Sequence, residues 1–108
     1  MRRGDLVTVA APGDYGKPRP AVVVQSDALD AADSVLVALL TSDLRPAPYY
    51  RLDLDPSPAN GLKAPSQVMV DKLIAYPRAK CGPTFGRLSP DELLTLNALL
   101  AVMLGLAD

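Results

Sequence analysis

One arginine of this sequence is held in a setting that suits phosphate chemistry. Arg19 lies between Pro18 and Pro20 and leads into an apolar run at residues 21–24. Each proline fixes its own φ and pushes the residue before it toward extended geometry. The guanidinium is therefore carried on a stiff segment at the start of a strand. An always-charged group with five N–H donors, held in this way, suits a phosphate or the charge that develops on a phosphorane. The alternative is an ordinary surface arginine in a proline-rich turn, which composition alone favours.

The residue types that are absent narrow the chemistry further. The chain has no histidine and a single cysteine, Cys81. Without histidine there is no Cys-His nucleophile, no histidine zinc site and no paired-histidine route to RNA cleavage. The sequence also has neither a Walker A motif nor Gly-x-Gly-x-x-Gly. We therefore expect no cofactor and no metal, and Cys81 is predicted to be a small packing residue.

Short apolar segments joined by loops rich in Gly and Pro must position these groups. Alternating or β-branched patterns predict strands over residues 5–10, 21–25, 35–40, 50–55 and 67–76. In the first, Val7 and Val9 share a face, and in the fourth Tyr50, Leu52 and Leu54 share the buried face. The last segment is predicted to bend near residues 71–72. This pattern predicts a mainly β chain that forms a small closed or nearly closed barrel.

The final segment carries clear start and stop signals for a helix. Ser89 and Glu92 form a capping box around Pro90, and Gly105 is placed to end the helix. Apolar residues surround almost the whole circumference between these signals, whereas a surface helix of a monomer needs one apolar stripe. The excess predicts a homodimer, in which one face packs on the barrel and the other on a second subunit. The alternative is a helix covered fully by its own barrel loops.

Length, charge and hydropathy limit the number of domains and the partners that the protein can have. The 108 residues suffice for one domain, residues 1–108. The net charge of −1 creates no general attraction for nucleic acid, so RNA binding requires a local basic patch. The N-terminus lacks a signal peptide, which predicts a cytoplasmic protein. Residues 93–106 would span about 21 Å as a helix, less than the ~30 Å bilayer core, so no membrane association is expected.

Several short motifs follow one another in an order that identifies a family. They are Arg-Gly-Asp at 3–5, Gly16-x-x-Arg19-Pro20 before a strand ending in Gln25, Thr41-Ser42, residues 61–66 leading into 68–71, and Gly-Arg-Leu-Ser at 86–89, which leads into the helix. The ordered set covers nearly the whole chain and resembles the MazF/PemK (Kid) family of toxin endoribonucleases. No single motif is specific, and the order carries the resemblance.

The resemblance implies a fold, an activity and partners. The fold would be a dimeric SH3-like barrel with a C-terminal helix, similar to CcdB and MazF. The protein would be the toxin of a type II toxin–antitoxin system that cleaves single-stranded mRNA at selected sequences and without metal. The 2′-hydroxyl would attack its own phosphate and leave a 2′,3′-cyclic phosphate and a 5′-hydroxyl. A cognate antitoxin would lie across the dimer groove and cover Arg19.

The same resemblance assigns roles to particular residues. Arg19 and Thr41 match the catalytic arginine and threonine, and Ser42 is a neighbouring candidate. Asp71 stands where some members place an acidic residue proposed as general base. Those members have an arginine two positions earlier, and here that position is Met69, which leaves Asp71 without a tuning cation. The alternative is that Asp71 is a structural or substrate-contacting residue.

Single-stranded RNA is gripped by aromatic stacking and a basic groove. With only 5% aromatic residues, tyrosines in loops stand out. The predicted RNA-binding residues are Tyr15, Lys17, Arg45, Tyr49 and Lys63.

Two rival functions share the predicted fold. A toxin like CcdB would poison DNA gyrase through its C-terminal helix region and would not need Arg19 and Thr41 near one phosphate. An inert SH3-like interaction module would need an exposed aromatic groove, and the chain has no Trp and one Phe. The segment around Arg19 favours the nuclease.

Overall fold

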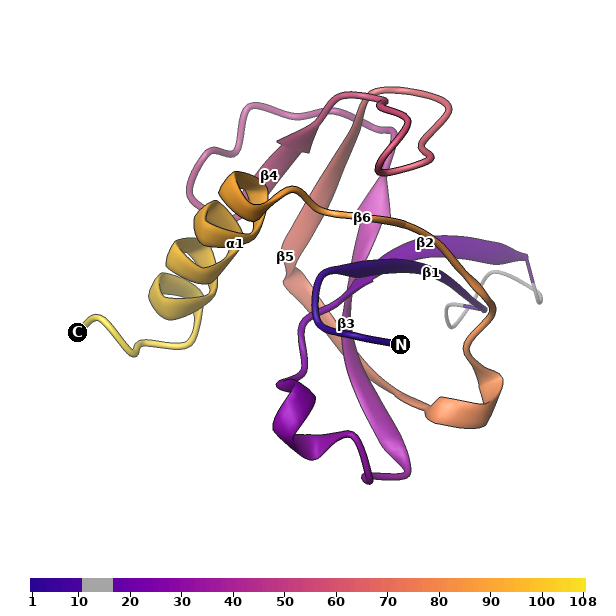
Figure 1. The fold of residues 1–108 in the computed structure, drawn as a ribbon. Coiled ribbons are helices and arrows are strands. Elements are labelled where there is room, and N and C mark those ends of the chain that lie inside the picture. The colour runs from indigo at the N-terminus through magenta and orange to yellow at the C-terminus, as the bar shows by residue number, and fades with distance from the viewer. Residues whose placement is uncertain (11–16) are drawn as a thin grey trace.

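A curled antiparallel sheet with one helix packed on it forms the molecule (Figure 1). The computed structural model describes residues 1–10 and 17–108. The strands follow the order β4-β5-β3-β2-β1-β6, with β4 and β6 at the edges of a half-barrel. The elements are β1 (Asp5–Ala10), β2 (Pro18–Val23), η1 (Asp27–Leu29), β3 (Ser34–Thr41), β4 (Arg51–Leu54), β5 (Ser66–Pro77), η2 (Arg78–Lys80), β6 (Thr84–Arg87) and α1 (Pro90–Met103). The predicted class, mainly β with a C-terminal helix, is confirmed.

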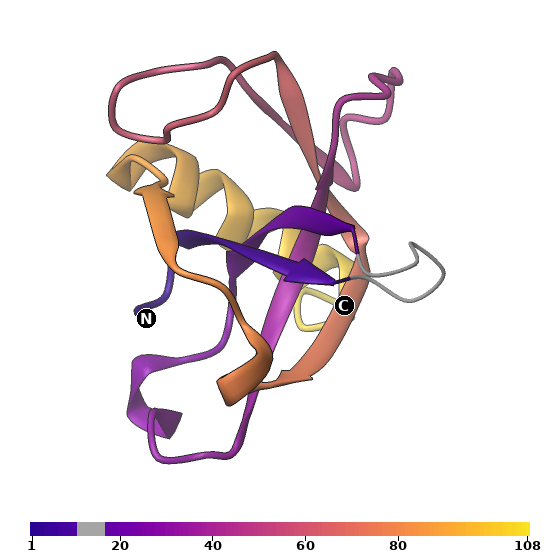
Figure 2. The same ribbon diagram turned by 90° about the vertical axis from the view of Figure 1, so that its right-hand side faces the viewer.

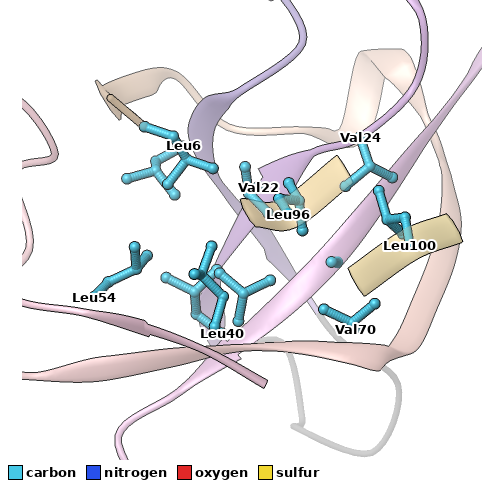
Figure 3. Close-up of a cluster of buried hydrophobic side chains, with 12 residues drawn as sticks. Leu6, Val22, Val24, Leu40, Leu54, Val70, Leu96 and Leu100 are labelled. Atoms are coloured by element: carbon cyan, nitrogen blue, oxygen red, sulfur yellow. The ribbon is translucent and has the colours of Figure 1, made fainter. Parts of the chain in front are cut away.

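Apolar side chains form two clusters on opposite faces of the sheet. The helix-side core joins Leu6, Val22, Leu40 and Val70 to Leu96 and Leu100 of α1, among others (Figure 3). In the view of Figure 2, α1 runs behind the β1–β2 hairpin. The opposite core contains Val7, Val9, Val35, Val37, Leu39 and Tyr76, among others. The strands contribute side chains to both clusters, because neighbouring residues of a strand point to opposite faces of the sheet.

Strand β2 begins earlier than the sequence pattern predicts. The expected strand was residues 21–25, whereas the observed one pairs Arg19 with Val9 and Pro18 with Ala10. Two prolines obscure this part of the strand, since proline lacks the N–H that a ladder uses. Arg19 therefore lies within the sheet rather than in the preceding loop.

The predicted bend in the long strand is confirmed as a change of register. Leu40 pairs with Val68 and Ala38 with Leu73, so four residues, 69–72, lie opposite Leu39 alone. Extra residues of this kind bend a strand and strengthen its twist. Before the bend β5 pairs with both β4 and β3, and after the bend it pairs with β3.

One strand was not predicted, and one sequence-based expectation is wrong. The sequence pattern gives no strand at residues 84–87, yet they form β6, which pairs with β1 and leads into the helix cap at Ser89. Gly86 is needed there, because a Cβ at this position would lie 2.1 Å from the backbone oxygen of Asn60. Tyr50 was expected to be buried beside Leu52 and Leu54, yet β4 begins one residue later and Tyr50 is exposed.

The start of α1 follows its sequence signals. The Ser89 hydroxyl accepts from the Glu92 amide at 3.1 Å, and the Glu92 carboxylate accepts from the Ser89 amide at 2.7 Å. Gly105, with φ of +72°, follows the last turn. Only Leu96 and Leu100 of the helix are fully buried, and Leu94 and Val102 remain exposed. No helix in the described part of the chain is long and apolar enough to cross a bilayer.

Removing the cap should weaken this helix measurably. We expect Ser89→Ala to lower the free energy of unfolding by about 1 kcal/mol, because the Glu92 amide loses its acceptor. Ser89→Asp restores an acceptor and should restore most of the stability. Urea denaturation of the three proteins measures the effect, and equal midpoints for wild type and Ser89→Ala would contradict it.

The Arg-Gly-Asp motif near the N-terminus stabilises the fold. The Asp5 carboxylate is buried, accepts from the Arg2 amide at 2.8 Å and forms an ion pair with Arg87 of β6. Arg3 Nε donates to the Val24 carbonyl at 2.8 Å. These contacts join the ends of β1, β2 and β6, so the motif has a structural role and lies outside the site described next.

Candidate functional site

The sheet places Arg19 and Thr41 on neighbouring strands and on the same face. Ala21 of β2 pairs with Leu39 of β3, and continuing this register by two residues sets Arg19 opposite Thr41. Thr41 in turn pairs with Gln67 of β5, and Gln67 pairs with Asp53 of β4. Directly opposite residues share a face, with Cβ atoms about 4.5–5.5 Å apart. Arg19, Thr41, Gln67 and Asp53 therefore form a polar row across four strands.

The polar row lies on the face of the sheet away from α1. Its neighbours along the strands, Val9, Ala21 and Leu39, belong to the opposite core. Leu52 and Leu54 point toward the helix-side core, so Asp53 between them points the other way. The polar row thus lies next to the opposite core on the same face of the sheet.

Arg19 is exposed although its backbone is paired within the sheet. A paired strand flanked by two prolines holds the Cα in place, while the guanidinium stays accessible to solvent. A phosphate can therefore reach the charge without any rearrangement of the strand, which is the preorganisation that electrostatic catalysis requires.

Thr41 ends β3 and begins a tight turn. Its Oγ1 accepts from the Asp43 amide at 3.1 Å, which orients the side chain and leaves the hydroxyl hydrogen available as a donor. Thr41 is half-buried, and the following Ser42 is exposed. A hydroxyl donor at the end of the strand next to Arg19 is chemically suited to hydrogen-bond a phosphate oxygen.

Asp71 lies in the bent part of β5 and is exposed. Within the described residues its carboxylate forms no hydrogen bond or ion pair. The structure does supply a cation near Met69, because Met69 pairs directly with Arg51 of β4. Arg51 directs Nη1 to Gln67 Oε1 and to the Asp43 carbonyl rather than to Asp71. The role of Asp71 as general base stays a prediction.

Gln67 anchors the loop that follows Thr41, and the sequence interpretation missed it. Its side chain is buried, and Oε1 accepts from the Arg45 amide at 3.0 Å and from Arg51 at 2.9 Å. Its Nε2 donates to the Arg45 carbonyl at 2.9 Å and to Asp53 Oδ1 at 2.7 Å. A glutamine within an apolar strand was the available signal, because a buried amide requires such partners.

The predicted RNA-binding residues lie in different places. Lys17 is exposed just before β2, Arg45 forms an exposed ion pair with Asp43 at 3.0 Å, and Tyr49 is 78% exposed at the end of the same loop. Tyr15 lies outside the described residues.

Lys63 is not brought to the polar row. It lines a separate cleft of about 370 Å³ with Phe85, Thr8 and Pro20. Thr8 and Pro20 form a pair one residue away from the Val9–Arg19 pair, and so they point to the other face of the sheet.

Cys81 is unsuited to nucleophilic chemistry. Burial raises the pKa of its thiol above the ordinary value, and the positive charge of Arg78 opposes the shift only in part. The thiol contacts the Pro77 carbonyl at 3.8 Å. A protonated thiol is a poor nucleophile, which agrees with a packing role.

The chain matches one protein family over nearly its whole length. Residues 2–104 match the family described as PemK-like, MazF-like toxin of type II toxin–antitoxin system. A relative from Mycolicibacterium smegmatis, named probable endoribonuclease MazF, is 42% identical over 108 residues, which cover 99% of each chain.

Solved structures share the fold at lower identity. The Mycobacterium tuberculosis toxin MazF-mt6 aligns with a TM-score of 0.80 and 20% identity, covering 94% of this chain and 96% of that one. A mycobacterial endoribonuclease in complex with its cognate antitoxin aligns with a TM-score of 0.81 and 21% identity. The alignment covers 98% of this chain and 96% of that one. A MazE–MazF structure from Deinococcus radiodurans aligns with a TM-score of 0.76 and 21% identity, and the alignment covers 97% of this chain and 95% of that one.

These matches agree with the family that the order of motifs indicates, and they support MazF rather than CcdB. The chain belongs to the PemK-like, MazF-like toxins of type II toxin–antitoxin systems, a family of endoribonucleases.

Proposed function

We propose that this toxin cleaves single-stranded RNA, mRNA in the cell, by attack of a 2′-hydroxyl on the adjacent phosphate. The observation that carries the proposal is the polar row, in which the register of β2 and β3, continued two residues beyond their last pair, sets Arg19 opposite Thr41 on one face of the sheet. The 42% identical relative named as a probable endoribonuclease supports the same class of activity.

The reaction sets three tasks for the protein. A proton must leave the 2′-hydroxyl, the pentacoordinate phosphorane must be stabilised, and the 5′-oxygen must depart with a proton. Arg19 neutralises the phosphorane charge, and Thr41, with Ser42 beside it, donates a hydrogen bond to a phosphate oxygen. Asp71 is the candidate base. The products are a 2′,3′-cyclic phosphate and a 5′-hydroxyl, and these roles need no metal or cofactor.

Cleavage of a defined RNA tests the proposal. Wild-type protein with excess EDTA should give discrete fragments that carry a cyclic phosphate and a 5′-hydroxyl. The same RNA with a 2′-deoxynucleotide before the scissile phosphate should stay intact at that position, because the nucleophile is missing. Cleavage of the deoxy-substituted position would contradict the mechanism. Intact RNA together with growth arrest on expression would favour a toxin that acts by binding, as CcdB does.

The exposed apolar side chains of α1 and the residues after it support a homodimer. Leu94, Val102, Leu104 and Leu106 are exposed, and a cleft of about 250 Å³ beside the helix is lined partly by Leu104 and Leu106. A second subunit that covers these side chains would remove their apolar surface from water.

A charge placed in this surface should separate the subunits. We expect Leu104→Asp to convert a dimer into a monomer in size-exclusion chromatography with light scattering, since burying an unpaired carboxylate is costly. Leu104 is 56% exposed, and Leu29 of η1, 57% exposed, offers a matched control in Leu29→Asp. A dimer that persists in Leu104→Asp would place the interface elsewhere.

We also propose a cognate antitoxin that binds this toxin and covers Arg19 with an acidic or apolar segment. Structural relatives have been solved with antitoxins, among them the mycobacterial endoribonuclease and MazE–MazF of Deinococcus radiodurans. An exposed arginine on the polar row is a natural site for an acidic segment.

A further inference from the structure

A small cleft adjoins the polar row on the side of β4. It measures about 180 Å³ and lies between the loop after β3 and the outward side chains of β4 and β5. Its lining includes Pro46, Pro48, Arg51, Asp53 and Gln67. Gln67 and Asp53 are members of the polar row, and Gln67 pairs directly with Thr41. The cleft therefore begins one strand away from Thr41 and lies on the same face as Arg19.

The walls of this cleft are held in place by hydrogen bonds. Gln67 uses both Oε1 and Nε2 twice, and through Arg45 it ties the loop to the sheet. Arg51 Nη1 donates to the Asp43 carbonyl at 2.8 Å as well as to Gln67. Pro46 and Pro48 stiffen the loop between these anchors. Little conformational freedom is left to lose when a ligand enters, which favours selective binding.

Two polar groups of the cleft remain unused by the described part of the chain. Asp53 accepts from Gln67 through Oδ1, and its Oδ2 has no partner there. Arg51 donates through Nη1 alone, and its Nε is buried without a partner. The cleft thus offers the Oδ2 acceptor and the Nη2 donors beside the flat apolar surfaces of two prolines.

The charges of this cleft disfavour a phosphate. The carboxylate of Asp53 offsets the guanidinium of Arg51, and the other nearby cation, Arg45, is already paired with Asp43. A nucleobase suits the cleft better, because its edge presents donors and acceptors side by side and its plane packs on apolar surfaces. Carboxylates accept from exocyclic amino groups of bases, and arginine donates to ring nitrogens and carbonyl oxygens. A cleft of about 180 Å³ has room for one planar group.

We propose that this cleft reads one base of the RNA next to the scissile phosphate, through Asp53 and Arg51, and that it selects a base carrying an exocyclic amino group. The inference rests on the proposed ribonuclease function and adds a specificity site to it. Gln67 is a positioning residue of this site, since it orients both reading side chains and anchors the loop.

Cleavage of an RNA library with randomised sequence tests the proposal. The 5′-hydroxyl ends are sequenced after digestion by wild type, by Asp53→Asn and by Asp55→Asn. The amide oxygen introduced by Asp53→Asn can still accept from Gln67, so the fold should persist. Asp55 is exposed, follows the same strand and makes no side-chain hydrogen bond within the described residues, which makes it the matched control.

The expected result is a preference for an amino-bearing base at one position near the cut. That preference should fall about tenfold or more in Asp53→Asn and stay unchanged in Asp55→Asn. An unchanged preference in Asp53→Asn would overturn the assignment. A uniform loss of rate at every sequence would overturn it also, because that pattern indicates a phosphate contact. If wild type yields no ends at all, the ribonuclease function itself fails.

Discussion

Arg19→Ala should lower the rate of RNA cleavage by about 10²–10³-fold while the protein stays folded. In the proposed mechanism the guanidinium stabilises the charge that develops on the phosphorane, and alanine leaves that charge to water. The side chain is exposed, and the backbone of residue 19 keeps its pairing with Val9, so stability should change little. Single-turnover cleavage with EDTA measures the rate, and circular dichroism with thermal melting checks the fold.

Two further variants test whether the rate depends on the arginine at position 19 or on the total positive charge of the protein. Lys80→Ala removes an exposed cation from η2, far along the chain from the polar row, and should retain the wild-type rate within about threefold. Arg19→Lys keeps the charge but loses the planar fork, and should recover only part of the activity. Full activity in Arg19→Ala would remove Arg19 from the mechanism and with it the main support for a catalytic polar row.

Leu96→Ala should lower the free energy of unfolding by about 2–5 kcal/mol. Leu96 is fully buried in the helix-side core, where it joins α1 to the side chains of Leu6 and Val22 (Figure 3). Truncation removes apolar contacts and leaves a cavity that the paired strands cannot collapse to fill. Urea denaturation at one fixed protein concentration measures the loss, because the apparent stability of the proposed dimer would depend on concentration.

The neighbouring residue provides the control for this change. Thr95 is exposed on the same turn of α1, and Thr95→Ala should change stability by no more than about 0.5 kcal/mol. A loss under about 1 kcal/mol for Leu96→Ala would mean that the helix contributes little to the core. In that case α1 would serve mainly the contact between subunits.

Local signals predicted the terminal helix well, because they act over a few residues. Ser89, Glu92 and Gly105 act within one turn of the helix ends, and their hydrogen bonds and φ angle are those that the residue types indicate. The same is true of Thr41 at the end of its strand. β6 escaped prediction since four residues containing a glycine carry almost no pattern, and their pairing partner, β1, is more than 70 residues away.

In the candidate site too, local features could be predicted from the sequence, whereas the pairing of distant residues could not. Residue types and short spacings are enough to predict that Arg19 is stiffly held, that histidine chemistry is excluded, and that a mainly β chain ends in a capped helix. The pairing of strands was needed to show that Arg19, Thr41, Gln67 and Asp53 share one row, and that Arg51 lies opposite Met69. Strand order and register join residues distant along the chain, and the hydrogen bonds that set them are made by backbone groups that every sequence shares.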